Sequence, residues 1–268
     1  MNCMNQQSIT LKFVTMHYQF AKERPDYSDL ASGRVFYSRS GYTAFPVRLA
    51  SEIFQPCVAI REANQVAGPG VLYDPCCGAA YHLCVLAYLH GRSIREVIGS
   101  DIDENAVLLA KQNFGLLSVG GLDKRISEIS EMLRLYGKQS HQEALDSAYV
   151  LRNRIFTLTE EHALKTKVFQ ASAMDGRILY ENLRGVAVDV VFADVPYGQH
   201  SEWRYPDANL ESSNPLWLML EALLGVLLPT SIVAIVSDKR QKVSHGGYQR
   251  IEQFQVGKRR VVILKPAM

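Results

Sequence analysis

The stretch Val71–Tyr81 reads VLYDPCCGAAY and decides the fold. A short apolar run ends in an acid, a turn of small residues follows, and a helical pattern then begins. Such a tight turn between a strand and its helix brings backbone close to a ligand at the carboxyl edge of an open α/β sheet. The turn lacks the Gly-x-Gly-x-x-Gly pattern that cradles a pyrophosphate, and an acid beside it favours a ligand with a cationic group. We therefore predict S-adenosylmethionine as the cofactor, bound here by Asp74, Cys76, Gly78 and Tyr81.

Further apolar runs follow this stretch and alternate with helical patterns. Runs that are apolar throughout are typical of parallel strands covered by helices on both faces. Two more strand-like runs flank the turn signal Gly257-Lys258 near the chain end. We predict an α/β fold with a doubly wound, mostly parallel, seven-stranded Rossmann-like methyltransferase sheet that closes with a C-terminal β-hairpin. The strands after the first are expected at Val97–Gly99, Val168–Gln170, Val188–Ala193, Ile232–Val236, Gln249–Val256 and Arg259–Leu264.

The pattern divides the chain into an N-terminal arm, residues 1–45, and a methyltransferase domain, residues 46–268. A stretch at about 120–167 shows helical spacing between two strands and is predicted as a helical insertion. Pro46 suits the first turn of a helix, whereas Pro56 is expected to kink or end that helix.

Composition limits the class of protein. With 268 residues, 47% of them hydrophobic and 21% charged, the chain is an ordinary globular one that can bury a large core. No segment reaches the about 18 uninterrupted apolar residues of a membrane span. The first residues lack the basic and apolar regions of a secretory signal. We expect a cytoplasmic monomer without membrane contact, and we read the five cysteines as reduced packing residues without a metal.

Charge is unevenly distributed along the chain. Residues 238–268 carry eight basic against two acidic side chains, and residues 1–48 carry six against three. The net charge of +2 therefore hides two basic ends around an acidic middle. Basic ends are the footprint expected for a polyanionic partner, although they also serve solubility alone.

Two further strand ends carry candidate cofactor ligands. The second strand ends at Asp101, where a carboxylate can accept the ribose hydroxyl protons, with Ile102 beside it. Asp103 is expected to cap the next helix. At the third strand end, Ala173 and Met174 can hold the adenine ring. An acid at a strand end is often only a helix cap, but the three stretches together, in this order and at this spacing, favour a cofactor site.

The fourth strand delivers Asp194-Val195-Pro196-Tyr197 to the same edge, and this loop resembles the Asn/Asp-Pro-Pro-Tyr loop of amino methyltransferases. An exocyclic amine on a base is a poor nucleophile because its lone pair is delocalised into the ring. The Asp194 carboxylate and the Val195 carbonyl could accept the two N–H groups, while Pro196 stiffens the loop. Tyr197 could stack on a base taken out of its helix. Asp194 is also counted among the cofactor contacts. The alternative interpretation is a simple turn.

Candidate RNA contacts surround this loop. Cations can reach phosphates, and aromatic residues beside a cation can stack on splayed nucleotides, although the aromatic residues are as readily packing residues. The candidates are Arg48, Trp203, Arg204, Lys239, Arg240, Lys242, Lys258, Arg259 and Arg260.

Several of these stretches together resemble the AviRa family of avilamycin-resistance methyltransferases. The resemblance rests on the run AFPVRLASEI at 44–53, the DPCCG turn, IGSDID at 98–103, the helical insertion and DVPYG at 194–198. It runs from about Ala44 to the C-terminus, and we place no counterpart for residues 1 to about 40. It implies a class I methyltransferase that modifies a guanine of 23S ribosomal RNA and so protects the ribosome from an orthosomycin antibiotic.

This chain departs from the family pattern at two positions. Ala80 stands where the family carries a second glycine, and Ala173 stands where it carries an acid. Adenine would then be held by packing and by the Met174 backbone N–H, with help from Asp175.

We therefore predict transfer of a methyl group from S-adenosylmethionine to an exocyclic amino group of a guanine in 23S ribosomal RNA, with that RNA or the large ribosomal subunit as partner. One rival is an amino methyltransferase acting on adenine N6 or on a protein glutamine. The other is a non-catalytic RNA-binding protein on a decayed methyltransferase fold.

Overall fold

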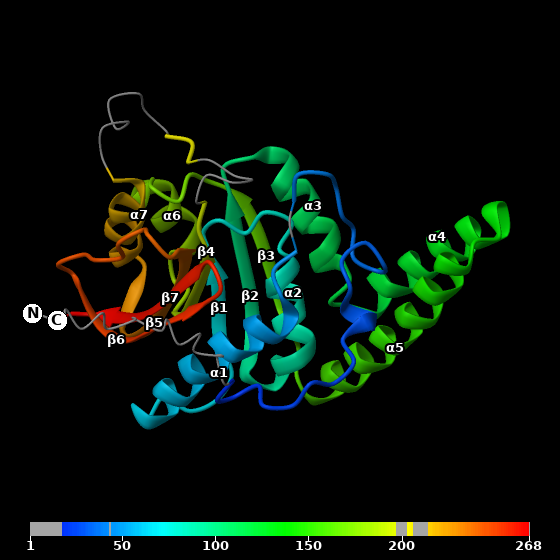
Figure 1. Cartoon of the computed structure of the whole chain (residues 1–268), viewed down its shortest axis with the longest axis horizontal. Helices are drawn as coiled ribbons and strands as arrows, with labels where there is room; N and C mark the ends of the chain where they lie inside the picture. Colours follow the sequence, from blue (N-terminus) through cyan, green and yellow to red (C-terminus); the bar gives the residue numbers. More distant parts are fainter. Residues whose placement is uncertain (1–17, 43, 197–202, 206–213, 268) are drawn as a thin grey trace, which may run out of the picture.

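Seven strands form one sheet in the order β3-β2-β1-β4-β5-β7-β6 (Figure 1). The computed structural model describes residues 18–42, 44–196, 203–205 and 214–267. The first five strands in this order are parallel, and β7 and β6 run antiparallel as the C-terminal hairpin. This confirms the doubly wound sheet with a closing hairpin. The strands are β1 (Gly70–Asp74), β2 (Ile94–Asp101), β3 (Lys165–Gln170), β4 (Val188–Asp194), β5 (Leu227–Asp238), β6 (Tyr248–Val256) and β7 (Arg259–Pro266).

Successive residues of a buried strand point to opposite faces of the sheet, so both faces are apolar here. Helices cover each of these faces. In β1, Leu72 joins one hydrophobic cluster, and Val71 and Tyr73 join the other. The first cluster includes α1 (Val47–Ala63), α2 (Tyr81–His90) and α3 (Glu104–Gly115). The second includes α6 (Gly176–Leu183) and α7 (Pro215–Leu224). Short 3-10 turns lie at Ser28–Leu30 and Gly91–Ser93.

We expected Pro56 to kink or to end the first helix, and it does not end it, since α1 continues to Ala63. A proline inside a helix costs about 3 kcal/mol through its missing N–H and its ring. Here the side chains of Leu49, Ile53 and Phe54 are buried around it, and this packing holds the helix together.

The predicted insertion is a helical hairpin made of α4 (Val119–Tyr136) and α5 (Gln139–Glu161), which projects from the body of the molecule (green in Figure 1). Gly137 joins the helices with a left-handed backbone, φ 59°. The third strand begins at Lys165, earlier than the predicted Val168. Its first residues are exposed at the sheet edge, so apolar content alone did not mark them.

The segment from residue 18 to Phe45 packs into the first cluster through Leu30, Phe36 and Phe45. Glu52 anchors its start: the buried carboxylate accepts hydrogen bonds from the backbone N–H groups of residues 19, 20 and 21. Arg48 donates to the carbonyl oxygens of Ala21 and Lys22. The side chain of Arg48, which we predicted to contact RNA, is therefore used in binding the N-terminal segment.

None of the described helices is both long and apolar enough to cross a membrane. Among the same residues, no three His, Cys, Asp or Glu side chains gather so as to hold a metal ion.

Candidate active site

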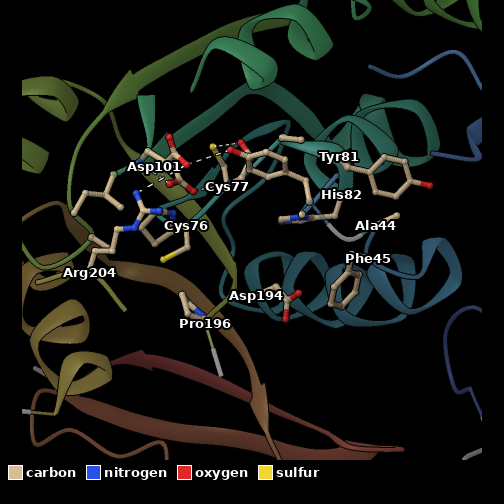
Figure 2. A pocket seen from close by; sticks show the side chains of 18 of the residues that line it. Ala44, Phe45, Cys76, Cys77, Tyr81, His82, Asp101, Asp194, Pro196 and Arg204 are labelled. Carbon is tan, nitrogen blue, oxygen red and sulfur yellow. Dashed lines mark hydrogen bonds and ion pairs between the residues drawn. The ribbon is translucent and has the colours of Figure 1, made fainter. Parts of the chain in front are cut away.

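A cavity of about 720 Å³ opens at the carboxyl edge of the sheet, where an open α/β fold binds ligands. The ends of β1, β2, β3 and β4 contribute to it, and the N-terminal segment closes another side. Figure 2 shows Asp194, Phe45 and His82 in one part of the cavity, with Asp101 and Arg204 in another. The residues expected at a cofactor and catalytic site that line the cavity are Cys76, Gly78, Tyr81, Asp101, Ile102, Ala173, Met174, Asp194 and Pro196.

The turn after β1 is held from beneath by Asp74. This side chain is completely buried, and its Oδ1 accepts a hydrogen bond from the Cys76 N–H at 2.8 Å. Gly78 has a left-handed backbone, φ 52°, and donates its N–H to Oδ2 of Asp101 at 2.9 Å. Asp74 was expected to contact the cofactor, but it lies under the turn and shapes it. The sequence places an acid at the end of this strand but does not show in which direction its side chain turns.

Asp101 presents a carboxylate to the cavity at the end of β2. Each of its oxygens accepts one backbone N–H, from Gly78 and from Asp103. A carboxylate can accept about four hydrogen bonds, so it retains capacity for ribose hydroxyls. Burial raises the pKa of Asp101 despite these two N–H donors.

Asp103 caps α3 as predicted, accepting the Asn105 N–H at 2.9 Å. Its second oxygen accepts the Tyr42 hydroxyl at 3.2 Å and lies 3.9 Å from the Arg204 guanidinium. Tyr42 and Arg204 both line the cavity, so this network links the N-terminal segment to the segment after β4.

The third strand end lacks the acid of the family pattern. Ala173 and Met174 line the cavity, and the Met174 N–H donates to the Ser172 hydroxyl at 3.3 Å. Asp175 caps α6 through the Ile178 N–H and does not line the cavity. Asp175 therefore does not replace the missing acid, contrary to our expectation, because its side chain turns back onto its own helix.

Asp194 ends β4 with a carboxylate turned toward the cavity. Its Oδ1 is buried and accepts no hydrogen bond from any described residue. Burial raises the pKa of Asp194 to about 6, against the opposing effect of two nearby cations, His82 and Arg259. A carboxylate in this state titrates near the pH at which a general base is most effective.

The rest of the predicted catalytic loop is only partly described. Val195 is buried, its N–H donates to the Val236 carbonyl at 3.0 Å, and its side chain does not line the cavity. Pro196 lines the cavity. Tyr197 lies outside the described residues.

His82 and Phe45 belong to the site, although sequence reasoning did not single them out. His82 stands in the first turn of α2, and its Nε2 lies 3.0 Å from Oδ2 of Asp74. Its ring packs with Phe45 and Phe192 in a cluster of three rings, with centroid distances of 5.8 Å to Phe45 and 5.0 Å to Phe192. The signal in the sequence was the position of His82 directly after the cofactor turn.

The predicted RNA-contacting cations gather at the same sheet edge. The Lys239 N–H donates to the Lys258 carbonyl at 2.9 Å, which joins the loop after β5 to the hairpin turn between β6 and β7. Lys239, Lys242 and Lys258 are exposed. Trp203 lines the cavity beside Arg204.

The three arginines near this edge make intramolecular contacts. Arg240 pairs with Asp238 at 3.0 Å, and Arg260 donates to the Gln241 carbonyl at 2.8 Å. The Arg259 guanidinium lies 5.4 Å from the centre of the Phe45 ring.

The family model described as rRNA methyltransferase AviRa matches residues 16–259. The match extends further toward the N-terminus than we expected, because the segment before Ala44 carries few distinctive motifs. A 23S rRNA (guanine(2535)-N(1))-methyltransferase of Streptomyces viridochromogenes is 40% identical over 250 residues, covering 93% of this chain and 96% of the relative. Two solved structures of the rRNA methyltransferase aviRa from that organism superpose with a TM-score of 0.81, at 39% and 38% identity. Each comparison covers 93% of this chain and 96% of the other.

Proposed function

The chain belongs to the AviRa family of rRNA methyltransferases, and from that premise we propose that it methylates N1 of a guanine in 23S ribosomal RNA with S-adenosylmethionine as donor. The observation that carries the proposal is Asp194, whose buried Oδ1 lacks a hydrogen-bond donor among the described residues at the edge of the cavity. A group of this kind is suited to accept a proton from a bound base.

The proposed target atom differs from the exocyclic amine that the Asp-Val-Pro-Tyr loop led us to expect. The relative is named for N1, which is a ring nitrogen. In neutral guanine N1 carries a proton, and its remaining electron pair is delocalised into the ring. Removal of that proton, rather than pyramidalisation of an amine, is the chemical problem at N1.

The cavity fits the proposed cofactor. Asp101 keeps capacity for the ribose hydroxyls, while Ala173 and Met174 offer a small apolar surface to the adenine. The turn at Cys76 and Gly78 would contact the methionine part of the cofactor through its backbone. The buried Asp74 adds negative charge beneath this turn. S-adenosylmethionine supplies an electrophilic methyl group on a positively charged sulfur.

Asp194 would perform the proton step. Its carboxylate would take the N1 proton and leave on N1 an electron pair that can bond to the methyl group supplied by the cofactor. The proton stays on Asp194 until it passes to water. At neutral pH the carboxylate is mostly ionised, because its pKa is about 6.

RNA binding would use the cations at the same edge. The exposed ammonium groups of Lys239, Lys242 and Lys258 can contact phosphates, and Trp203 is placed at the cavity to stack on a displaced base. Ribosomal RNA is the substrate that family membership favours over adenine N6 or a protein glutamine.

The test is an Asp194→Asn variant, which keeps the size of the side chain and removes the base. We expect loss of methyl transfer to ribosomal RNA, with cofactor affinity by calorimetry unchanged within about twofold because cofactor recognition lies at the other strand ends. Asp175→Asn is the matched control, since asparagine caps a helix as well as aspartate does. Mass spectrometry of the product from the native enzyme should locate the methyl group on N1. A methyl group on the exocyclic amine, or unchanged turnover of Asp194→Asn, would contradict the proposal.

A further inference from the structure

A buried contact between a carboxylate and a histidine lies at the end of β1, the strand that pairs with β4, which ends in Asp194. Asp74 at the end of β1 is completely buried, and its Oδ2 lies 3.0 Å from Nε2 of His82, whose side chain is 7% exposed. The two atoms do not meet the angle required for a hydrogen bond, so the contact is mainly electrostatic. Burying a carboxylate is costly unless a cation compensates, and His82, whose pKa is raised against its burial by Asp74 and Asp194, is the titratable side chain in contact with it.

The histidine ring is held from several directions. Phe45 from the N-terminal segment and Phe192 from β4 both pack against it and against each other, with centroid distances of 5.8, 5.0 and 5.6 Å among the three rings. Phe192 stands two residues before Asp194 in the same strand. The position of the ring is therefore coupled to the strand that delivers Asp194, and Figure 2 shows the two side chains in the same part of the cavity.

The charged groups that face Asp194 come from three elements. His82 from α2 and Arg259 from β7 stabilise its ionised form, and Asp74 from β1 opposes it. The Cys76 thiol also senses the Asp194 charge. For His82, burial disfavours the imidazolium, but the hydrogen bond and charge of Asp74, followed by the charge of Asp194, outweigh it and raise the pKa.

We propose that His82, held in place by Asp74, is a positioning residue that keeps Asp194 ionised and aimed at the substrate for removal of the base proton. The inference rests on the proposed function and adds the residue on which the base depends. His82 acts through Asp194, and neither Phe45 nor Phe192 can substitute for it because neither carries charge.

The decisive measurement is the pH profile of single-turnover methylation. For the native enzyme the rate should rise with pH, with a midpoint near pH 6 where Asp194 is half ionised, and level off about one pH unit higher. His82→Gln removes the neighbouring positive charge, so the midpoint of this rise should move to higher pH by about one pH unit. Cofactor affinity should stay within about threefold.

The matched control is His90→Gln on the same helix. His90 contacts the Ser51 hydroxyl at 2.9 Å, and burial lowers its pKa to about 4, so it carries no charge at neutral pH. Its replacement should leave the midpoint unchanged. An unmoved midpoint in a folded His82→Gln variant would overturn the inference.

A second measurement avoids any change at His82. In the native protein, NMR titration should show His82 with a pKa above 6.5, and Asp194→Asn should lower that pKa because coupling between two charges is reciprocal. An identical His82 titration in the two proteins would refute the inference. If Asp194→Asn retains full turnover, the proposed function fails instead, so the two failures are distinguishable.

Discussion

At the scale of single residues, Ala80 shows how a departure from the family pattern is accommodated. Its backbone is left-handed, φ 55°, and the side chain is completely buried. The turn thus keeps the conformation that a glycine would adopt there without strain. A non-glycine residue in this region costs about 1–2 kcal/mol. The alanine therefore stores strain without changing the path of the chain, which is why the suggestion of a decayed cofactor turn loses its basis.

Ala80→Gly should stabilise the protein. Relief of the left-handed strain exceeds the about 0.5–1 kcal/mol of extra entropy that glycine loses on folding, so we expect a net gain of about 0.5–1 kcal/mol in the free energy of unfolding. Urea unfolding at fixed pH measures it. The neighbouring Ala79→Gly is the control and should destabilise, since Ala79 has no positive φ. A less stable Ala80→Gly variant would show that the strain is absent.

Asp194 also links function to stability. Its pKa in the folded protein is about 6, against 3.8 for an ordinary aspartate, so the folded state binds this proton more tightly than the unfolded state. The contribution of Asp194 to stability is then greatest below pH 3.8 and declines as pH rises to about 6. The difference corresponds to about 3 kcal/mol.

We therefore expect Asp194→Asn to be more stable than the native protein at pH 7.5, by up to about 3 kcal/mol, because asparagine resembles the protonated acid. The advantage should shrink toward pH 4. Thermal unfolding across this pH range gives the comparison, with Asp175→Asn as the variant whose stability should follow the native curve. Equal stability of Asp194→Asn and native protein at pH 7.5 would be inconsistent with the raised pKa.

At the scale of elements, helix α1 joins the N-terminal segment to the sheet. The Glu52 carboxylate of α1 holds three consecutive N–H groups at the start of this segment. Further along, the segment supplies cavity-lining residues between Tyr37 and Phe45. The anchor at Glu52 and one wall of the cavity therefore belong to the same short length of chain.

Glu52→Ala should lower stability by about 2–4 kcal/mol, because hydrogen bonds to a charged group contribute about 1.5–3 kcal/mol each and do not add fully. It should also weaken cofactor binding, since the wall formed by the segment loses its anchor. Calorimetry and urea unfolding report the two effects. Glu62→Ala, at an exposed position of the same helix, should change neither. If Glu52→Ala binds the cofactor with native affinity, the anchoring of the N-terminal segment does not contribute to cofactor binding.

At the scale of the whole molecule, the basic side chains lie where the cavity opens. β5 ends at the carboxyl edge, and the antiparallel hairpin returns to the same edge, so two clusters that are distant in sequence become neighbours. The location puts positive charge beside the opening of the cavity rather than on a remote face.

Replacing Lys239, Lys242 and Lys258 by glutamine should weaken RNA binding at all sequences alike. Each lost phosphate contact should reduce the slope of log affinity against log salt by about 0.7–0.9, so a decrease of about 2–3 is expected for the triple variant. Fluorescence titration over a salt series measures it. Lys165→Gln is the control, because this exposed lysine stands at the start of β3, at the opposite sheet edge. An unchanged slope would show that these three lysines do not contact RNA phosphates.

The sequence by itself determined the fold and the order of the site. Apolar runs that end in short polar motifs specify strands and the turns after them, because these signals act between residues close in the chain. The turn after β1, the Asp103 cap and the C-terminal hairpin were all predictable on this ground. The continuation of α1 through Pro56 was not, because that depends on what the helix packs against.

Only the tertiary structure decided which side chains face the ligand and which support it. Asp74 looked like a cofactor ligand but turns beneath the strand ends to meet His82, and Arg48 looked like an RNA contact but binds the N-terminal segment. Burial and Coulomb interactions depend on distance in space, not on separation in sequence. For that reason the stretch VLYDPCCGAAY predicted where the candidate site lies. The contact between Asp74 and His82 could be recognised only in the folded chain.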